Sequence, residues 1–105
     1  MLSNGFSDLL KDEKVEEVSH LLKLMAHPMR LKLLCHLIEG EKSVLEIAEL
    51  CDAPQVATSQ ALAKLKADHL VECRKEGQFV YYRIADERIG QMMTAMRKIF
   101  CGSKN

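Results

Sequence analysis

Several features that common protein classes require are missing from this 105-residue sequence. No apolar run approaches the roughly 20 residues that a membrane-spanning helix needs. The first residues, MLSNGFSDLLKDEK, contain no charged segment followed by a long apolar block, which is the pattern of an export signal. We therefore expect a protein of the cytoplasm that has no membrane partner.

The sequence also lacks the motifs of common catalytic and cofactor sites. It contains no Gly-rich phosphate loop and no His-Glu-x-x-His pair, and Ser59 has no His or Asp partner nearby in the chain. The histidines are isolated from one another, and a capping or surface role is the simpler interpretation of each: His20, His27, His36 and His69. We expect no enzymatic activity, no cofactor and no metal site.

None of the cysteines belongs to a Cys-x-x-Cys pair, which argues against zinc-ribbon and thioredoxin-type motifs. In a reducing compartment Cys35, Cys51, Cys73 and Cys101 should be free thiols at rest. Cys35 lies in the apolar stretch MAHPMRLKLLCHL, residues 25–37. Because a buried free cysteine is common in protein cores, this stretch alone leaves open whether Cys35 is a core residue or a reactive thiol.

What the sequence does contain is a charge balance that differs between its two halves. Residues 1–53 carry 6 Lys and Arg against 10 Asp and Glu, whereas residues 54–105 carry 9 against 5. Such an asymmetry is typical of an acidic scaffold with a basic working surface. By itself it does not identify a nucleic-acid partner.

The helical spacing of apolar residues predicts four helices in the first two thirds of the chain, over residues 13–26, 28–39, 44–51 and 55–67. Pro28 suits the first turn of the second helix, and Gly40 supplies its end. Ser43 and Glu46 have the spacing of a capping box at the start of the third helix.

The apolar pattern then changes from a helical period to short β-rich runs. LVECRK and FVYYRI flank the turn EGQ, which predicts a hairpin. Asp86 can cap a last helix over about residues 87–101. The order α-α-α-α-β-β-α predicts a mainly α-helical fold with a β-hairpin wing, that is, a winged helix-turn-helix formed by residues 1–105 as one domain.

The helix over residues 55–67 carries the side chains that a DNA-reading helix needs. Side-chain amides and hydroxyls can bond base edges in the major groove, and lysines can bond phosphates. On this helix we expect DNA contacts from Gln55, Thr58, Ser59, Gln60 and Lys64, and on the hairpin from Arg74, Lys75 and Gln78. The alternative is an ordinary surface helix with a solvated polar face.

The first and last helices are more apolar than a monomer of this size needs. We expect them to pair with a second subunit through Leu21, Met92, Met93 and Met96. A two-fold dimer sets two recognition helices about 34 Å apart and so reads an inverted repeat. The alternative is that these side chains only complete the core of a monomer.

Three segments, MAHPMRLKLLCHL, SVLEIAELCDAPQVATSQALAKLKADHLV and RKEGQFVYYRI, resemble the ArsR family of winged-helix repressors over about residues 18–101. The resemblance implies a homodimer that represses transcription and leaves its operator when an inducer binds. Thiol ligands of the metal-sensing members would fall at Ser43, Leu45 and Ala48, and a zinc-binding His would fall at Arg88. Both metal sites of the family are therefore missing.

Cys35 follows RLKLL, and Cys101 follows the aromatic in IFC, near the end of the last helix. This pair resembles the persulfide- and thiol-sensing branch of the family that includes BigR, SqrR and HlyU. The resemblance implies that reactive sulfur species or oxidants link Cys35 to Cys101 and release the operator. We expect Cys101 to be the more accessible thiol, and Cys35 to be sheltered and harder to ionise. Cys51 and Cys73 have no counterpart in this pattern.

Two other regulatory mechanisms stay open from the sequence. One is a metal-responsive repressor with a non-standard ligand set, for instance Cys35 with His36 and Cys101. The other is a redox-silent DNA-binding regulator that acts as an anti-repressor or through a protein partner.

Overall fold

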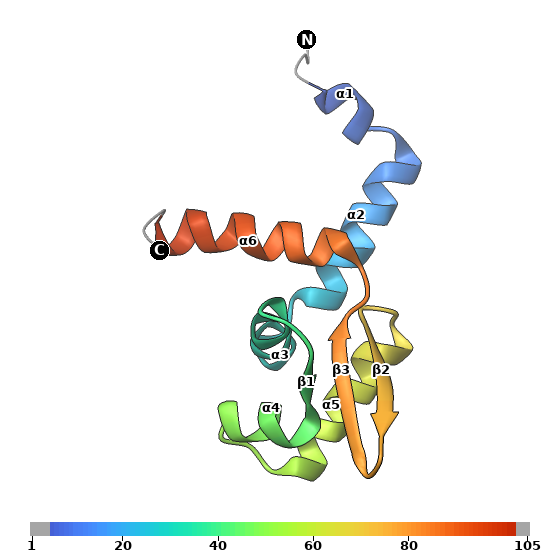
Figure 1. The fold of residues 1–105 in the computed structure, drawn as a ribbon. Helices are drawn as coiled ribbons and strands as arrows, with labels where there is room; N and C mark the ends of the chain where they lie inside the picture. Colours follow the sequence, from blue (N-terminus) through green and yellow to red (C-terminus); the bar gives the residue numbers. More distant parts are fainter. Residues whose placement is uncertain (1–4, 103–105) are drawn as a thin grey trace.

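Six helices and a small antiparallel sheet at one edge make up the computed structural model, which describes residues 5–102 (Figure 1). In chain order the elements are α1 Phe6–Leu9, α2 Asp12–Met25, α3 Pro28–Ile38, β1 Lys42–Ser43, α4 Val44–Leu50, α5 Gln55–Ala67, β2 Val71–Glu76, β3 Phe79–Ile84 and α6 Glu87–Cys101. The predicted winged helix-turn-helix is confirmed, and α2 to α6 lie close to the predicted helices.

Local capping fixes where two of these helices begin. The Ser43 hydroxyl accepts a hydrogen bond from the Glu46 backbone N–H (3.1 Å), and the Ser43 N–H donates to the Glu46 carboxylate (2.8 Å). This reciprocal pair confirms the predicted capping box. At α6, a carboxylate oxygen of Asp86 accepts from the Arg88 backbone N–H at 3.0 Å.

The sheet has one strand more than the sequence predicts. β1 pairs antiparallel with β3, with Lys42 opposite Tyr82 and Ser43 opposite Tyr81, so the strand order is β1-β3-β2. Two residues are too few to show an alternating pattern, and this strand exists only because β3 is beside it. α1, a single turn, also has no predicted counterpart.

β2, β3 and the turn between them form the wing. The turn consists of Gly77 and Gln78, and Gly77 has a φ of 63°. A positive φ at the first turn position favours glycine and matches the twist of the two strands.

The core lies where α3 meets the other helices and the sheet. Its large fully buried side chains come from α3, α4, α5 and α6 and from the residue before β2; the apolar ones are Leu33, Leu34, Ile47, Leu62, Leu65, Leu70 and Ile89. Arg88 at the start of α6 pairs with Glu17 of α2. Figure 1 shows α2 and α6 at one end of this core, with α4, the start of α5 and the wing tip at the opposite end.

Candidate DNA-reading surface and thiol pair

α5 is placed as the recognition helix by the turn that precedes it. Asp52 adopts a positive φ of 51°, and the Ala53 N–H donates to the carbonyl oxygen of Ala48 at 3.0 Å, which closes α4 before Pro54 starts α5. The inward side of α5 carries Leu62 and Leu65. On its outer sides, the predicted DNA-contacting residues Gln55, Ser59, Gln60 and Lys64 are exposed.

Thr58 requires a correction, because its side chain has no exposed surface. Its hydroxyl donates to the carbonyl oxygen of Pro54 at 3.0 Å, within the first turn of α5. Thr58 therefore packs in the interior and stabilises the first turn of α5, and its side chain is not exposed for contact with DNA. A short polar residue in the first turn of a helix can bond either the backbone of that helix or an outside partner, and residue type alone does not distinguish the two.

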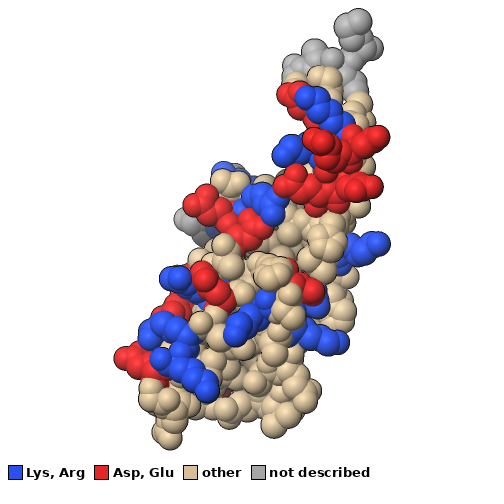
Figure 2. Space-filling view, turned by 90° about the vertical axis from the view of Figure 1, so that its right-hand side faces the viewer, with Lys and Arg blue, Asp and Glu red and all other residues tan. Residues whose placement is uncertain are grey.

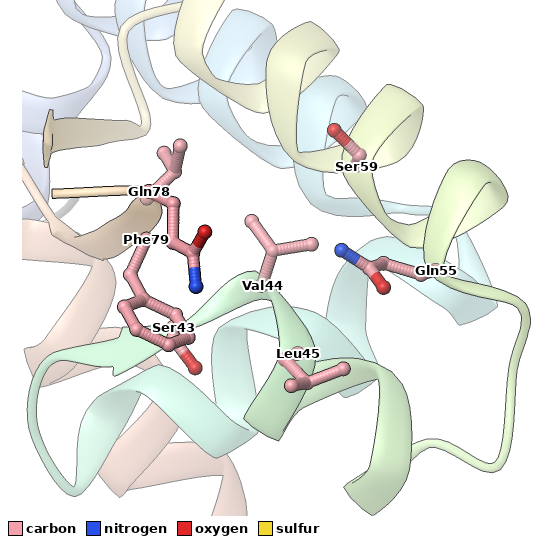
Figure 3. Close-up of a pocket in the computed structure, with 8 residues that line it drawn as sticks. Ser43, Val44, Leu45, Gln55, Ser59, Gln78 and Phe79 are labelled. Atoms are coloured by element: carbon pink, nitrogen blue, oxygen red, sulfur yellow. The ribbon is translucent and has the colours of Figure 1, made fainter.

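A cavity of about 310 Å³ lies between the start of α4, the recognition helix and the wing tip (Figure 3). In Figure 3, Gln55 and Ser59 come from α5, and Gln78 faces them from the wing. All the lining side chains are uncharged: Ser43, Val44, Leu45, Gln55, Ser59, Gln78, Phe79 and Val80. The cleft thus offers amides and hydroxyls, which bond phosphate oxygens and base edges without carrying charge.

Arg74 of the wing is exposed, and its guanidinium is engaged by neighbouring side chains. Its guanidinium donates twice to the Glu41 carboxylate (2.9 and 2.8 Å) and once to Glu76 (2.8 Å), and its Cζ lies 4.7 Å from the centre of the Tyr81 ring. The two carboxylates raise the pKa of Arg74, and Arg74 in turn lowers the pKa of Glu41. Arg74 is itself exposed, as are Lys75 and Gln78, so its predicted DNA contact stays a prediction, made by a guanidinium that is already paired with two carboxylates.

Charge is distributed unevenly over the surface. Figure 2 shows acidic side chains gathered over α2, which carries Asp12, Glu13, Glu16 and Glu17. The exposed start of the recognition helix carries no charged side chain until Lys64. The reading surface is polar and neutral at its centre, with cations only beside it.

The thiols of Cys35 on α3 and Cys101 at the end of α6 are both free and exposed. Partial burial raises the pKa of the Cys35 thiol above its ordinary value, and Cys101 raises it further through its charge. α3 and α6 contact each other in the fold, so these two thiols, far apart in the sequence, lie on neighbouring helices.

The position of Cys35 corrects one expectation and bears out another. The side chain is exposed in the single chain and not sheltered, as is Ile38 one turn later. α3 instead buries Leu33, Leu34 and Leu37. Because this helix is apolar on nearly every side, the sequence pattern did not identify which side faces inward. The expectation that Cys35 is harder to ionise agrees with its raised pKa.

The predicted dimer residues divide into two groups. Leu21 and Met93 are buried in the core of the single chain, so they have almost no exposed surface for contact with a second subunit. Met92 and Met96 are partly buried. The large exposed apolar side chains of α2 and α6 are others: Val15 (43% exposed), Leu22 (47%), Ile99 (73%) and Phe100 (82%). None of these four is among the predicted dimer contacts, although Phe100 stands directly beside Cys101.

Within residues 5–102, no group of three or more His, Cys, Asp or Glu side chains is arranged to hold a metal ion. Over the same residues, no helix is both long and apolar enough to cross a membrane.

Comparison with known proteins decides the family. The model of the bacterial regulatory protein arsR family matches residues 27–72. A biofilm growth-associated repressor of Xylella fastidiosa is 36% identical over 93 residues, which cover 89% of this chain and 82% of the relative. The chain belongs to the ArsR family. As an ArsR-family protein it is a DNA-binding transcriptional regulator.

Solved ArsR-type structures have the same fold. Reduced HlyU from Vibrio cholerae superposes with a TM-score of 0.79 at 36% identity, covering 86% of this chain and 95% of HlyU. A homodimeric winged helix-turn-helix domain from Mycobacterium bovis, described as a possible ArsR-family regulator, gives 0.70 at 31% identity, covering 93% and 86%.

Proposed function

We propose that this ArsR-family protein is a homodimeric repressor of the cytoplasm that binds an inverted-repeat operator and leaves it when Cys35 and Cys101 become linked by reactive sulfur species or oxidants. The observation that carries the proposal is the exposure of two free thiols on α3 and α6, two helices that contact each other in the fold. The similarity to an HlyU structure described as reduced supports the view that thiol oxidation state matters in such proteins.

The chemistry of the link takes two balanced steps. The Cys101 thiolate attacks the terminal sulfur of a low-molecular-weight persulfide, R–S–SH; the S–S bond breaks, RSH leaves, and Cys101 carries the persulfide. The Cys35 thiolate then attacks the inner sulfur of that persulfide, hydrosulfide leaves, and a disulfide forms. Because its raised pKa favours the protonated thiol, we assign Cys35 to the second step.

Other routes end in a related bridge. If Cys35 has also received a sulfur, its terminal sulfur makes the attack, and the bridge contains three sulfur atoms. With a peroxide, one thiolate becomes a sulfenic acid, which the other thiol converts to a disulfide with loss of water. A direct disulfide requires Cα atoms within about 7 Å, so a longer sulfur bridge demands less movement.

The link reaches the recognition helix through Arg30 of α3. One terminal nitrogen of Arg30 donates to the carbonyl oxygen of Leu24 on α2 (2.9 Å), and the other pairs with Asp68 directly after α5 (3.0 Å). A displacement of α3 by the thiol link therefore acts on both α2 and α5. Coupling between two such sites is typically worth about 1–3 kcal/mol, or about 5- to 150-fold in affinity.

Dimerisation supplies the geometry that this coupling changes. Leu22, Ile99 and Phe100 expose apolar surface on α2 and α6, and a second copy covers it in the proposed dimer. Two recognition helices related by the two-fold axis then meet successive major grooves about 34 Å apart. A change in the angle between the subunits moves both helices off this spacing.

The test combines intact-protein mass spectrometry with DNA binding. An operator is selected from random duplexes with reduced protein, and affinity is measured by fluorescence anisotropy before and after treatment with glutathione persulfide. We expect both thiols to be consumed and affinity to fall about 5- to 150-fold. Cys35→Ser and Cys101→Ser should bind the operator but not respond.

The matched control is the double variant Cys51→Ser, Cys73→Ser, which keeps the proposed pair and should respond as the wild type does. Complete release of DNA from protein whose Cys35 is unmodified would contradict the mechanism. Stoichiometric metal in purified protein, with release driven by that metal, would favour the metal-responsive alternative.

A further inference from the structure

The outermost ridge of the recognition helix is partly apolar. Thr58, Leu62 and Leu65 mark the inward side of α5. At 3.6 residues per turn, Val56, Gln60 and Ala63 lie on the opposite side, and all three are exposed. Gln55 and Ser59 turn instead toward the cleft beside the wing (Figure 3). Along this outermost side of α5 the exposed side chains are therefore apolar at Val56, an amide at Gln60 and a methyl group at Ala63.

Val56 is unusually exposed for a branched apolar residue. It is 69% exposed, and among the large apolar side chains of residues 5–102 only Ile99 and Phe100, at the other end of the molecule, are more exposed. Val56 does not belong to the core cluster. A β-branched residue also disfavours a helix slightly in comparison with alanine. Folding therefore gives no reason for valine at this position.

We infer that Val56 reads a thymine by packing on its C5-methyl group in the major groove, beside an adenine bonded by Gln60. The inference rests on the proposed function, since it requires α5 to enter that groove. In the major groove each base pair presents a different pattern of hydrogen-bond donors and acceptors, and the thymine methyl is the one apolar group in these patterns. Residues at the start of a recognition helix contact base edges, and Val56 is the second residue of α5.

The neighbours of Val56 favour a DNA partner over a second protein surface. Ala57, Ser59 and Gln60 are small or polar and also exposed, so no apolar patch continues along the ridge. Ala63, two turns further along, carries only a methyl group and lets the helix approach the bases closely. The restricted χ1 of valine fixes its two methyl groups in place, which suits contact with a single methyl.

The test removes one methyl group at a time from the DNA. Each thymine of the selected operator is replaced singly by uracil, which lacks only the C5-methyl, and binding of reduced protein is measured by anisotropy at fixed salt. We expect one thymine in each half-site whose replacement weakens wild-type binding about fourfold, the effect of one methyl-sized apolar contact. Val56→Ala should bind the unmodified operator with the same loss and be insensitive to uracil at that position.

Lys64→Gln is the matched control on the same helix. It should weaken thymine and uracil operators equally and reduce the salt dependence, as loss of a phosphate contact does. If no thymine is sensitive, or if Val56→Ala keeps the wild-type sensitivity, the inference is wrong while the proposed DNA binding stands. Reduced wild-type protein that selects no duplex would overturn the proposed function, and this inference with it.

Discussion

The two ends of the molecule expose different kinds of side chain. The reading end, formed by α4, α5 and the wing, exposes uncharged amides and hydroxyls at the start of α5, with Lys64 and Lys75 beside them and Arg74 already paired. The opposite end exposes Phe100, Ile99 and Leu22 together with two thiols. In the proposed function, the first end contacts DNA, whereas the second end pairs with another subunit and receives the chemical signal.

The largest expected effect is on self-association at the thiol end. Phe100→Ser removes an exposed aromatic whose burial is worth about 1.5–3 kcal/mol, counted twice in a two-fold dimer. Self-association should fall at least about a hundredfold by that reckoning. Sedimentation velocity over a range of concentrations measures it.

Phe79→Ser makes the same substitution at the wing tip, where the aromatic is also exposed, and should leave the dimer unchanged. Equal dimerisation of the Phe100 variant and the wild type would show that the apolar surface of α6 serves another purpose.

Arg30 connects the two ends, and its replacement should weaken their communication. Arg30→Met loses both the Leu24 and the Asp68 contacts. The ratio of operator affinities before and after persulfide treatment should shrink by about two- to thirtyfold, while both thiols still react. Arg83→Met breaks the exposed pair with Glu72 on the sheet and is the control. An unchanged ratio in Arg30→Met would exclude this connection.

Within the wing, Arg74 and Lys75 should give opposite results despite being neighbours. Lys75→Gln should lower operator affinity for every sequence and reduce the salt slope by about one, with no change in thermal stability. Arg74→Gln should lower the thermal midpoint, because Glu41 and Glu76 lose their partner, and should leave the salt slope intact. Anisotropy against salt and circular dichroism against temperature separate the two; identical behaviour would refute the distinction.

The smallest expected effect concerns the ionisation of Cys35. In the Cys51→Ser, Cys73→Ser background, the further change Cys101→Ser removes one of the two causes that raise the pKa of Cys35. Alkylation of Cys35 by iodoacetamide near pH 8 should become faster, as followed by mass spectrometry. A slower reaction would mean that Cys101 assists ionisation.

The raised pKa of Cys35 also determines how the stability of the fold changes with pH. Folding raises the pKa of Cys35 above its ordinary 9.0 and so favours the protonated thiol. That contribution is complete below the ordinary value and is lost as the pH rises through the pKa of the folded state.

Local signals in the sequence were sufficient for most of the fold. Capping residues such as Ser43 and Asp86, and the glycine of the wing turn, act within a few positions of themselves, so the predicted elements agree with the structure. β1 was missed because its pairing partner β3 lies nearly forty residues further on. Its existence depends on tertiary structure.

The site was predicted less well, because residue type does not reveal which way a side chain faces. Thr58 is polar yet buried, and Cys35 stands in an apolar helix yet is exposed. Leu21 and Met93 have the composition of an interface but fill the core. In each case a neighbouring helix, placed by distant parts of the chain, decides the orientation.

The short strand β1 limits how any signal can act on DNA. Since Lys42 and Ser43 pair with β3 while Ser43 also caps α4, β1 ties the wing to the helix-turn-helix within one subunit. In the proposed dimer, a link between α3 and α6 therefore acts by turning the wing and recognition helix of one subunit together, relative to those of the other.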